Sequence, residues 1–202
     1  QWPALFKIDA GAEAQAIERA KPDAIYNVTF GGDLAKFVRE GGTRGLFEGR
    51  NVYGLLSGEP EYMDPLGDEA PEGWIVTGYP WSEITEGSGK VFVDAYMAKY
   101  DDHPRIGSLV GYMTVQSIVA VLEKAGSTDS EAIRAAFADL PVSTPVGDIK
   151  FRSQDHQATM GAYVGTIALK DDKGTLESWV YKDGADYTLS DEEVMKLRGS
   201  GN

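Results

Sequence analysis

The sequence predicts an α/β fold in which parallel sheets are flanked by helices and β-hairpins lie near the C-terminus. Over residues 1–79, short apolar runs bounded by Gly, Pro and Asp alternate with helical patterns. Helical patterns continue through residues 88–126, and alternating segments joined by turn signals occupy residues 146–183. Strands separated by helices form parallel sheets with crossover helices, whereas alternating strands next to turn signals form hairpins. We therefore expect the chain to run from an α/β half to a β-rich end.

Helices and strands are expected to alternate in the first part of the chain. The alanine-rich segment 12–20 has a helical pattern that Pro22 ends, and the apolar run DAIYNV at residues 23–28 has strand character. Two glycines then lead into a helix whose apolar face carries Leu34, Phe37 and Val38. Two more strands are expected at residues 51–57 and 73–79.

The second part begins with helices. Residues 88–100 place apolar side chains at helical spacing, and residues 108–126 are apolar almost all round, with Gly126 placed as a C-terminal cap. We expect this long helix to be buried on several sides, and no apolar run approaches the length of about 20 residues that spans a bilayer. Thr128 or Asp129 is expected to cap a further helix. The strands of the β-rich end are expected at residues 146–152, 162–170 and 175–183.

The composition argues against nucleic acid and membrane surfaces as partners. The chain of 202 residues carries 19 basic and 32 acidic side chains, a net charge of −13 that repels phosphate backbones and anionic lipids. It has no cysteine, which excludes disulfides, thiolate zinc sites and a cysteine nucleophile. No signal peptide opens the chain, but Gln1 is not an initiator methionine, so nothing follows about its compartment.

Several short motifs match catalytic or metal-binding patterns only in part. In EGSGK, the positions where a phosphate loop requires a glycine and a Ser or Thr hold Ile84 and Val91. The chain has two histidines, and neither His103 nor the pair Asp155–His156 has the convergent partners of a metal or catalytic site. Three carboxylates in residues 57–64 lack the spacing of a calcium loop. We therefore predict no metal, no cofactor and no catalytic residue.

The carboxyl ends of the first two strands are the best candidate for a binding site. In an open parallel sheet, ligands lie beyond the carboxyl ends of the strands. Residues 30–33 follow the first strand and residues 58–61 follow the second, so both groups lie at one rim. Glu59 suits an ammonium group there, and Phe30 suits apolar packing or a cation–π contact. The residues alone leave a second interpretation open, in which the two glycines after Phe30 are turn residues and Glu59 caps a helix.

Five segments taken in order resemble the periplasmic substrate-binding proteins of branched-chain amino acid ABC transporters. They are KPDAIYNVTFGGDLAKFVREG, GLLSGEPEYMDP, APEGWIVTGYPW, GYMTVQSIVAVLEKAGSTDSEAIRAAFADL and TPVGDIKFRSQDHQATMGAYVGTI. The resemblance covers residues 2–198 and is to the later part of such proteins. They have the type I periplasmic binding fold, in which two α/β lobes close on a solute. It implies an incomplete two-lobed architecture. Residues 1–79 would belong to the second lobe, residues 80–149 to the C-terminal part of the first, and residues 150–202 to a crossover and return to the second.

The resemblance also implies site residues. In amino-acid-binding members, the loop matching VTFGG carries an aromatic contact and the loop matching SGE carries an acid that pairs with the ligand's ammonium, which implies Phe30, Gly31 and Glu59. The start of the long helix carries an aromatic from the opposite lobe, which implies Tyr112. Phe30 lacks the hydroxyl of a tyrosine, and Glu61 is a second acid that leaves the amine partner open. The loops that clasp the ligand's carboxylate lie upstream of this chain in family members, so the solute is left open among amino acids, amides, urea and aromatic acids.

The function implied by the resemblance is solute binding without catalysis. The chain would be a periplasmic component of an ABC importer that binds an amino acid or a related amine or amide and delivers it to a membrane permease. A ligand-sensing domain of a regulator or receptor with the same fold is the alternative, and a hydrolase would need a nucleophile with an oriented base. Placed in the family, the chain lacks strands and helices of both lobes. We therefore expect that copies of it cover each other's exposed edges, unless the preceding segment accompanies it.

Overall fold

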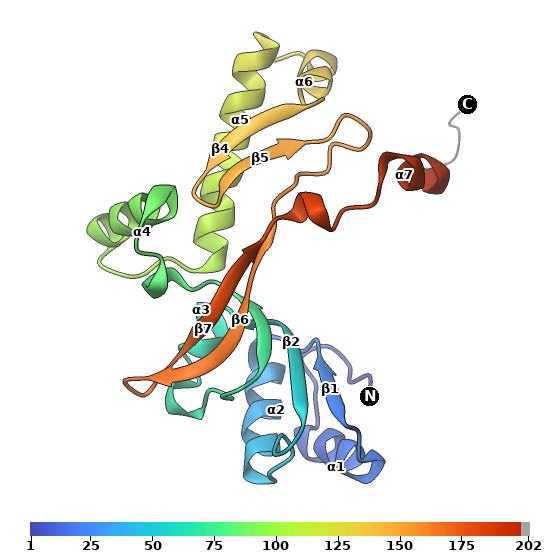
Figure 1. Cartoon of the computed structure of the whole chain (residues 1–202), viewed down its shortest axis with the longest axis vertical. Coiled ribbons are helices and arrows are strands. Elements are labelled where there is room, and N and C mark those ends of the chain that lie inside the picture. Colours follow the sequence, from blue (N-terminus) through green and yellow to red (C-terminus); the bar gives the residue numbers. More distant parts are fainter. Residues whose placement is uncertain (199–202) are drawn as a thin grey trace. The chain divides into compact units, whose positions relative to one another are not determined.

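Helices and strands alternate over residues 10–78 in the computed structural model, which describes residues 1–198 (Figure 1). Helices then occupy residues 87–136, and strands follow over residues 140–182. The helices are α1 (Ala10–Ala20), α2 (Gly31–Thr43), α3 (Pro60–Met63), α4 (Gly87–Tyr100), α5 (Ile106–Ala125), α6 (Ser130–Ala136) and α7 (Asp191–Arg198). The strands are β1 (Ala24–Asn27), β2 (Asn51–Gly58), β3 (Ile75–Gly78), β4 (Leu140–Thr144), β5 (Gly147–Phe151), β6 (Ala162–Lys170) and β7 (Lys173–Lys182). The helices and strands predicted before residue 130 are confirmed, with ends that differ by a few residues.

The chain forms two compact units. The first comprises Gln1–Glu83 and Tyr163–Tyr181, and the second comprises Ile84–Ala162 and the chain from Lys182 onward. The lobe boundaries predicted from the sequence, after residues 79 and 149, concern the family fold and stay a prediction. The assignment of either unit to a lobe of the family fold remains a proposal.

The first unit is built on a five-stranded mixed sheet. The strand order is β1-β2-β3-β6-β7; β1, β2 and β3 are parallel, and β6 is antiparallel to β3. Strands β6 and β7 are joined by Asp171 and Asp172, whose φ angles of 52° and 58° match a two-residue hairpin turn. The predicted parallel sheet and C-terminal hairpin are thus both present in one sheet.

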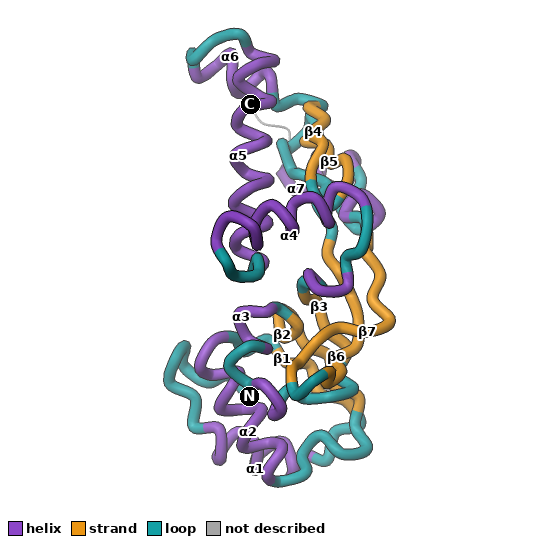
Figure 2. The backbone as a smooth tube through the Cα atoms, turned by 90° about the vertical axis from the view of Figure 1, so that its left-hand side faces the viewer, coloured by secondary structure: helices purple, strands orange, loops and turns teal. Residues whose placement is uncertain are grey.

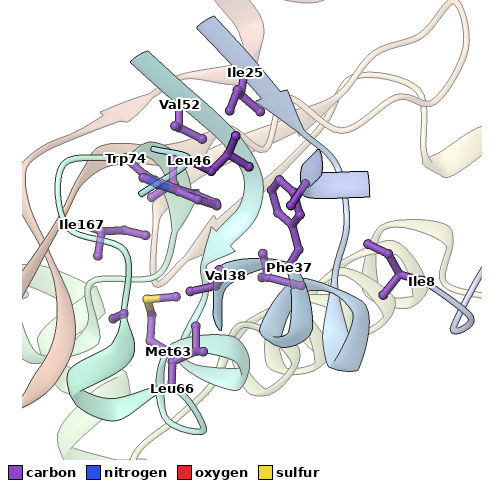
Figure 3. Packing of buried hydrophobic residues seen from close by; sticks show 14 of the residues in the cluster. Ile8, Ile25, Phe37, Val38, Leu46, Val52, Met63, Leu66, Trp74 and Ile167 are labelled. Carbon is purple, nitrogen blue, oxygen red and sulfur yellow. The ribbon is translucent and has the colours of Figure 1, made fainter. Parts of the chain in front are cut away.

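One face of this sheet packs on helix α2 and forms the hydrophobic core (Figure 3). Leu34, Phe37 and Val38 of α2 are buried, as the predicted apolar face requires. They meet Val52 of β2 and Trp74 in one cluster, and α1 lies against α2. Complete burial of a large apolar side chain contributes about 1.5–3 kcal/mol, so this face holds the first unit together.

The other face of the sheet carries an exposed apolar row. The strand register aligns Tyr26 with Tyr53 and Tyr53 with Ile75 across β1, β2 and β3. Their exposed fractions are 66%, 41% and 40% respectively. Three neighbouring strands therefore present large apolar side chains to solvent, and β1 stands at the edge of the sheet.

The second unit packs the long helix α5 against α6 and the hairpin β4–β5 (Figure 2). Asp129 accepts hydrogen bonds from two backbone N–H groups at the start of α6, and Gly126 caps α5 in the left-handed conformation, as predicted. The buried residues of α5 are Leu109, Met113, Ser117 and Val121, which form a single stripe. The prediction of burial on several sides is therefore wrong. Exposed apolar residues on α5 include Val110, Tyr112, Val115, Ile118, Val119 and Leu122.

Helix α5 also corrects the prediction that no apolar run approaches the length of a membrane span. By length and composition alone, its 20 residues are sufficient to cross a membrane. A core helix of a globular unit meets the same criterion, and α5 packs on α6 and β4. Helix α3, strand β4 and helix α7 were not among the predicted elements. Strand β4 contains Pro141, which marks edge strands, and helix α7 is a short, polar segment.

Candidate functional site

Phe30 and Glu59 both follow the carboxyl ends of neighbouring parallel strands. Strand β1 ends at Asn27, strand β2 ends at Gly58, and the two strands pair in parallel from Ala24 with Asn51 onward. Parallel strands bring their carboxyl ends to the same edge of a sheet. The structure therefore brings the loops that carry these two predicted residues to one rim of the first unit.

Phe30 is the extended residue just before helix α2, and its half-buried ring lies edge-on to Phe6 at a centroid distance of 5.7 Å. Gly31 follows with a φ of 58°, a left-handed conformation that residues with a Cβ rarely adopt. The glycine thus allows the sharp change of direction from loop to helix. Gly31 is therefore a turn residue, as one of the two interpretations of the sequence had it. A turn residue can also lie beside a bound ligand, so this does not exclude a role in binding.

Glu59 is a buried carboxyl group with an exposed fraction of 4%. Its Oε2 atom has no hydrogen-bond partner among the described residues, and its side chain makes no capping bond to helix α3. Burial, followed by the nearby negative charge of Glu61, raises the pKa of Glu59 to about 8. The interpretation of Glu59 as a helix cap therefore has no support in the geometry. A buried acid with an oxygen that lacks a partner is a common feature of functional sites.

The other two acids of this segment differ from Glu59 in their surroundings. Glu61 is half-buried and Asp64 is exposed. Neither carboxylate is buried enough for a single counter-ion to contribute much to the stability of its charged form. Glu59 is accordingly the acid of the three whose environment most favours a charged ligand group.

A bulge at the end of β2 places Glu59. The ladder between β2 and β3 shifts its register between Gly54 and Gly58, and Leu56 within this stretch has a φ of 63°. The backbone N–H of Leu56 donates to Oγ1 of Thr77 on β3 at 2.9 Å. The bulge turns the Ser57 side chain back toward Gly54, where an added Cβ would lie 2.4 Å from the Ser57 hydroxyl. Bulges are common next to binding sites, where they redirect a side chain.

Tyr112, the remaining predicted residue, lies on α5 in the second unit. Its side chain is 49% exposed, and its ring lies 5.1 Å from the ring of Phe92 on α4. Together with residues of the turn between β4 and β5, these rings line a mostly apolar groove. Its contact with the same ligand as Glu59 stays a prediction.

Tyr79 was missed by the sequence analysis. It follows the end of β3, is buried, and has a hydroxyl group without a hydrogen-bond partner among the described residues. Burial, then the neighbouring Tyr163, raises its pKa above the usual range of tyrosine. Its position after the third parallel strand was the signal available in the sequence, because ligand contacts gather at such strand ends.

Asp155 and His156, the pair considered for catalysis, make contacts that stabilise the local structure. Asp155 accepts hydrogen bonds from the guanidinium of Arg152, which holds the pKa of this carboxyl below its usual range. The ring of His156 lies 5.9 Å from that of Phe137. Among the described residues, no group of three or more His, Cys, Asp or Glu side chains is arranged to hold a metal ion.

A family model described as "Periplasmic binding protein" matches residues 4–175. The chain belongs to the periplasmic binding protein family. It is 30% identical over 138 residues to the leucine-, isoleucine-, valine-, threonine- and alanine-binding protein of Pseudomonas aeruginosa, an alignment that covers 67% of this chain and 36% of that protein. The predicted resemblance to branched-chain amino acid binding proteins is thereby confirmed.

Solved structures of periplasmic binding proteins confirm the fold. The chain superposes on the closed leucine-, isoleucine-, valine-, threonine- and alanine-binding protein of Brucella ovis with a TM-score of 0.76 and 21% identity, over 92% of this chain and 50% of that one. A solute-binding protein of Rhodopseudomonas palustris in complex with 3,4-dihydroxybenzoic acid gives a TM-score of 0.69 and 22% identity, over 87% and 49% respectively. The chain therefore spans about half the length of these solved relatives.

Proposed function

We propose that this periplasmic binding protein is the extracytoplasmic solute-binding component of an ABC importer, and that its solute is an aliphatic amino acid. The observation that carries the proposal is Glu59, a buried carboxyl group with an oxygen that lacks a partner, at the carboxyl ends of parallel strands. An ammonium group offers three N–H donors and the opposite charge. The solute would supply the partner that Glu59 lacks, and it would be handed on to a membrane permease unchanged.

The remaining contacts follow from the same arrangement. Phe30 offers a half-buried aromatic ring to the apolar part of the solute, and Gly31 leaves the backbone beside it partly accessible. Tyr112 of the second unit is proposed as an additional aromatic contact. The relative of Pseudomonas aeruginosa is named for binding five amino acids with small or aliphatic side chains, which supports the same class of solute.

An aromatic carboxylic acid is the second candidate solute. Burial raises the pKa of Glu59 to about 8, so at neutral pH the free protein holds this carboxyl largely protonated. A protonated carboxyl donates a hydrogen bond and is compatible with a hydroxyl or carboxylate on the solute. Solved relatives are in complex with 3,4-dihydroxybenzoic acid and with 4-hydroxybenzoate. A ligand-sensing domain of a regulator or receptor, with the same fold, would bind through the same residues.

Thermal unfolding of the intact protein tests the proposed solute. A ligand at about 100 times its Kd adds about 2.7 kcal/mol, which raises the Tm of a chain of this length by about 5–10 °C. We expect this shift with L-leucine and a much smaller one with 4-methylpentanoate, which has the same side chain and no amine. A shift with 4-hydroxybenzoate and none with L-leucine would transfer the proposal to aromatic acids.

The absence of catalysis is tested on the same samples. L-leucine recovered after prolonged incubation with the protein should be chemically unchanged. Conversion of the solute by the purified protein would contradict a purely binding function.

A further inference from the structure

The carboxyl ends of β1 and β2 are connected by side chains beyond the strand ladder. The amide nitrogen Nδ2 of Asn27 donates to the Ser57 hydroxyl at 3.3 Å. The amide oxygen Oδ1 of Asn27 accepts from the Thr29 hydroxyl at 2.8 Å and from the Thr29 backbone N–H at 3.3 Å. Asn27 and Ser57 are 5% and 0% exposed, so the bond between them is shielded from water, and the two bonds from Thr29 are partly buried. One amide side chain thus holds both loops that carry predicted ligand contacts.

The backbone alone does not hold these loops together. The parallel pairing of β1 with β2 ends at Asn27 and Gly54, before either loop begins. Beyond that pair, the chain of β1 continues through Thr29 to Phe30, and the chain of β2 passes through its bulge to Ser57 and Glu59. Asn27 contacts the residue before Phe30 and the residue two positions before Glu59. Its donor and its acceptor are both in use, and Asn combines the two functions in one short side chain.

We propose that Asn27 is a positioning residue: through Thr29 and Ser57 it fixes Phe30 relative to Glu59 and so sets the affinity for an amine-bearing solute. This inference rests on the proposed function. A site that binds both the charge and the apolar part of one small molecule needs its two contacts at a fixed separation, because small displacements weaken directional contacts. The strained backbone of Leu56 in the bulge, with a φ of 63°, is consistent with a loop whose shape is imposed by its partners.

A purely structural Asn27 would behave differently from a positioning one. Loss of buried hydrogen bonds lowers the stability in both cases. Only a positioning role makes the effect on solute affinity depend on Glu59. A double-mutant cycle separates the two, because it measures the coupling between two side chains.

The experiment measures the affinity for L-leucine by calorimetry in the wild type, Asn27→Ala, Glu59→Gln and the double variant, at a temperature where all are folded. We expect Asn27→Ala to weaken binding about tenfold in the wild-type background, which corresponds to about 1.4 kcal/mol. In the Glu59→Gln background the same change should weaken it less than about twofold. The loss of Tm caused by Asn27→Ala should be the same in both backgrounds.

Two further variants keep the test decisive. Thr29→Val removes the 2.8 Å bond while preserving the shape of the side chain, and it should show the same coupling if Asn27→Ala does not fold. Asn51→Ala, at the exposed start of β2, is the matched control and should leave the affinity unchanged.

The outcomes distinguish this inference from the proposed function. If Asn27→Ala weakens binding equally in both backgrounds, or does not weaken it in the wild-type background, the positioning role is overturned. The proposed function still holds in that case if Glu59→Gln weakens the binding of L-leucine. If the wild type does not bind L-leucine, both are overturned. If Glu59→Gln binds it as the wild type does, the positioning role is overturned, because the amine contact is then not made by Glu59.

Discussion

Glu59 is buried and its Oε2 atom has no hydrogen-bond partner among the described residues, which makes the side chain unfavourable to the folded protein in the absence of solute. Desolvation acts against its charged form, and the raised pKa records that cost. The nearby negative charge of Glu61 acts in the same direction. A solute with an ammonium group removes the imbalance, because it supplies the missing donor and the opposite charge together. Glu59 would therefore destabilise the free protein and stabilise the complex with the solute.

The first prediction at this scale concerns the charge of Glu59. Replacing one partner of a buried pair typically costs about 2–5 kcal/mol, so Glu59→Gln should weaken binding of L-leucine at least about thirtyfold. Calorimetric titration measures the change, and Glu61→Gln is the matched control, with a small effect expected. An unchanged affinity in Glu59→Gln together with a large loss in Glu61→Gln would assign the amine contact to Glu61.

The second prediction is a release of protons on binding. In the free protein Glu59 is protonated below its pKa of about 8. An ammonium group favours the carboxylate and lowers this pKa in the complex, so binding at pH 7 expels a proton. The affinity for L-leucine should therefore increase as the pH rises toward 8 and then level off. Titrations at pH 7 in buffers of different ionisation enthalpy should show close to one proton released. In Glu59→Gln this release should disappear; its persistence would place the titrating group elsewhere.

At the scale of elements, glycines allow β2 and β3 to approach closely beside the site. A Cβ at Gly78 would lie 2.2 Å from the backbone oxygen of Gly58, and one at Gly58 would lie 2.6 Å from the side chain of Val76. Backbone atoms of two paired strands cannot move apart without loss of the ladder. The distance between these strands therefore depends on the absence of side chains at Gly58 and Gly78. It also sets the position at which the chain leaves β2 toward Glu59.

We predict that Gly78→Ala lowers the free energy of unfolding by more than about 2 kcal/mol, since the clash is with backbone. Gly42→Ala is the control: this glycine lies near the end of α2 with no atom within 4 Å of an added Cβ. The control should raise the stability by up to about 1 kcal/mol, because alanine favours helices over glycine. Urea unfolding of both variants measures the difference, and equal stabilities would contradict the close approach.

Local patterns predicted the elements around the site better than the contacts within it. The apolar face of α2 and the runs that form β1, β2 and β3 are periodic signals, and all are present in the structure. The hydrogen bonds of Asn27 and the orphan hydroxyl of Tyr79 depend on which strands become neighbours, which periodicity does not report. Helix α5 shows the same limit. Its apolar composition predicted burial, but composition does not tell which elements cover a helix.

At the scale of the whole chain, two exposed apolar surfaces among the described residues bear on association. One is the row of Tyr26, Tyr53 and Ile75 across the sheet of the first unit, which begins on the edge strand β1. The other is on α5, where Val115, Ile118, Val119 and Leu122 recur at the spacing of one helix face. Exposed apolar stripes and free strand edges favour association, since each Å² removed from water contributes about 25 cal/mol.

We therefore predict that the 202-residue chain on its own self-associates, with the apolar stripe of α5 in the contact. Light scattering after size-exclusion chromatography should give a mass above that of one chain. Val115→Lys, on the stripe, should lower that mass toward the monomer, because a charge in an apolar contact is costly to desolvate. Thr114→Lys adds the same charge at the exposed neighbouring position outside the stripe and should have little effect. A monomeric wild type would show that neither apolar surface drives association. An associated chain that is equally insensitive to both lysines would instead move the contact from α5 to the sheet of the first unit.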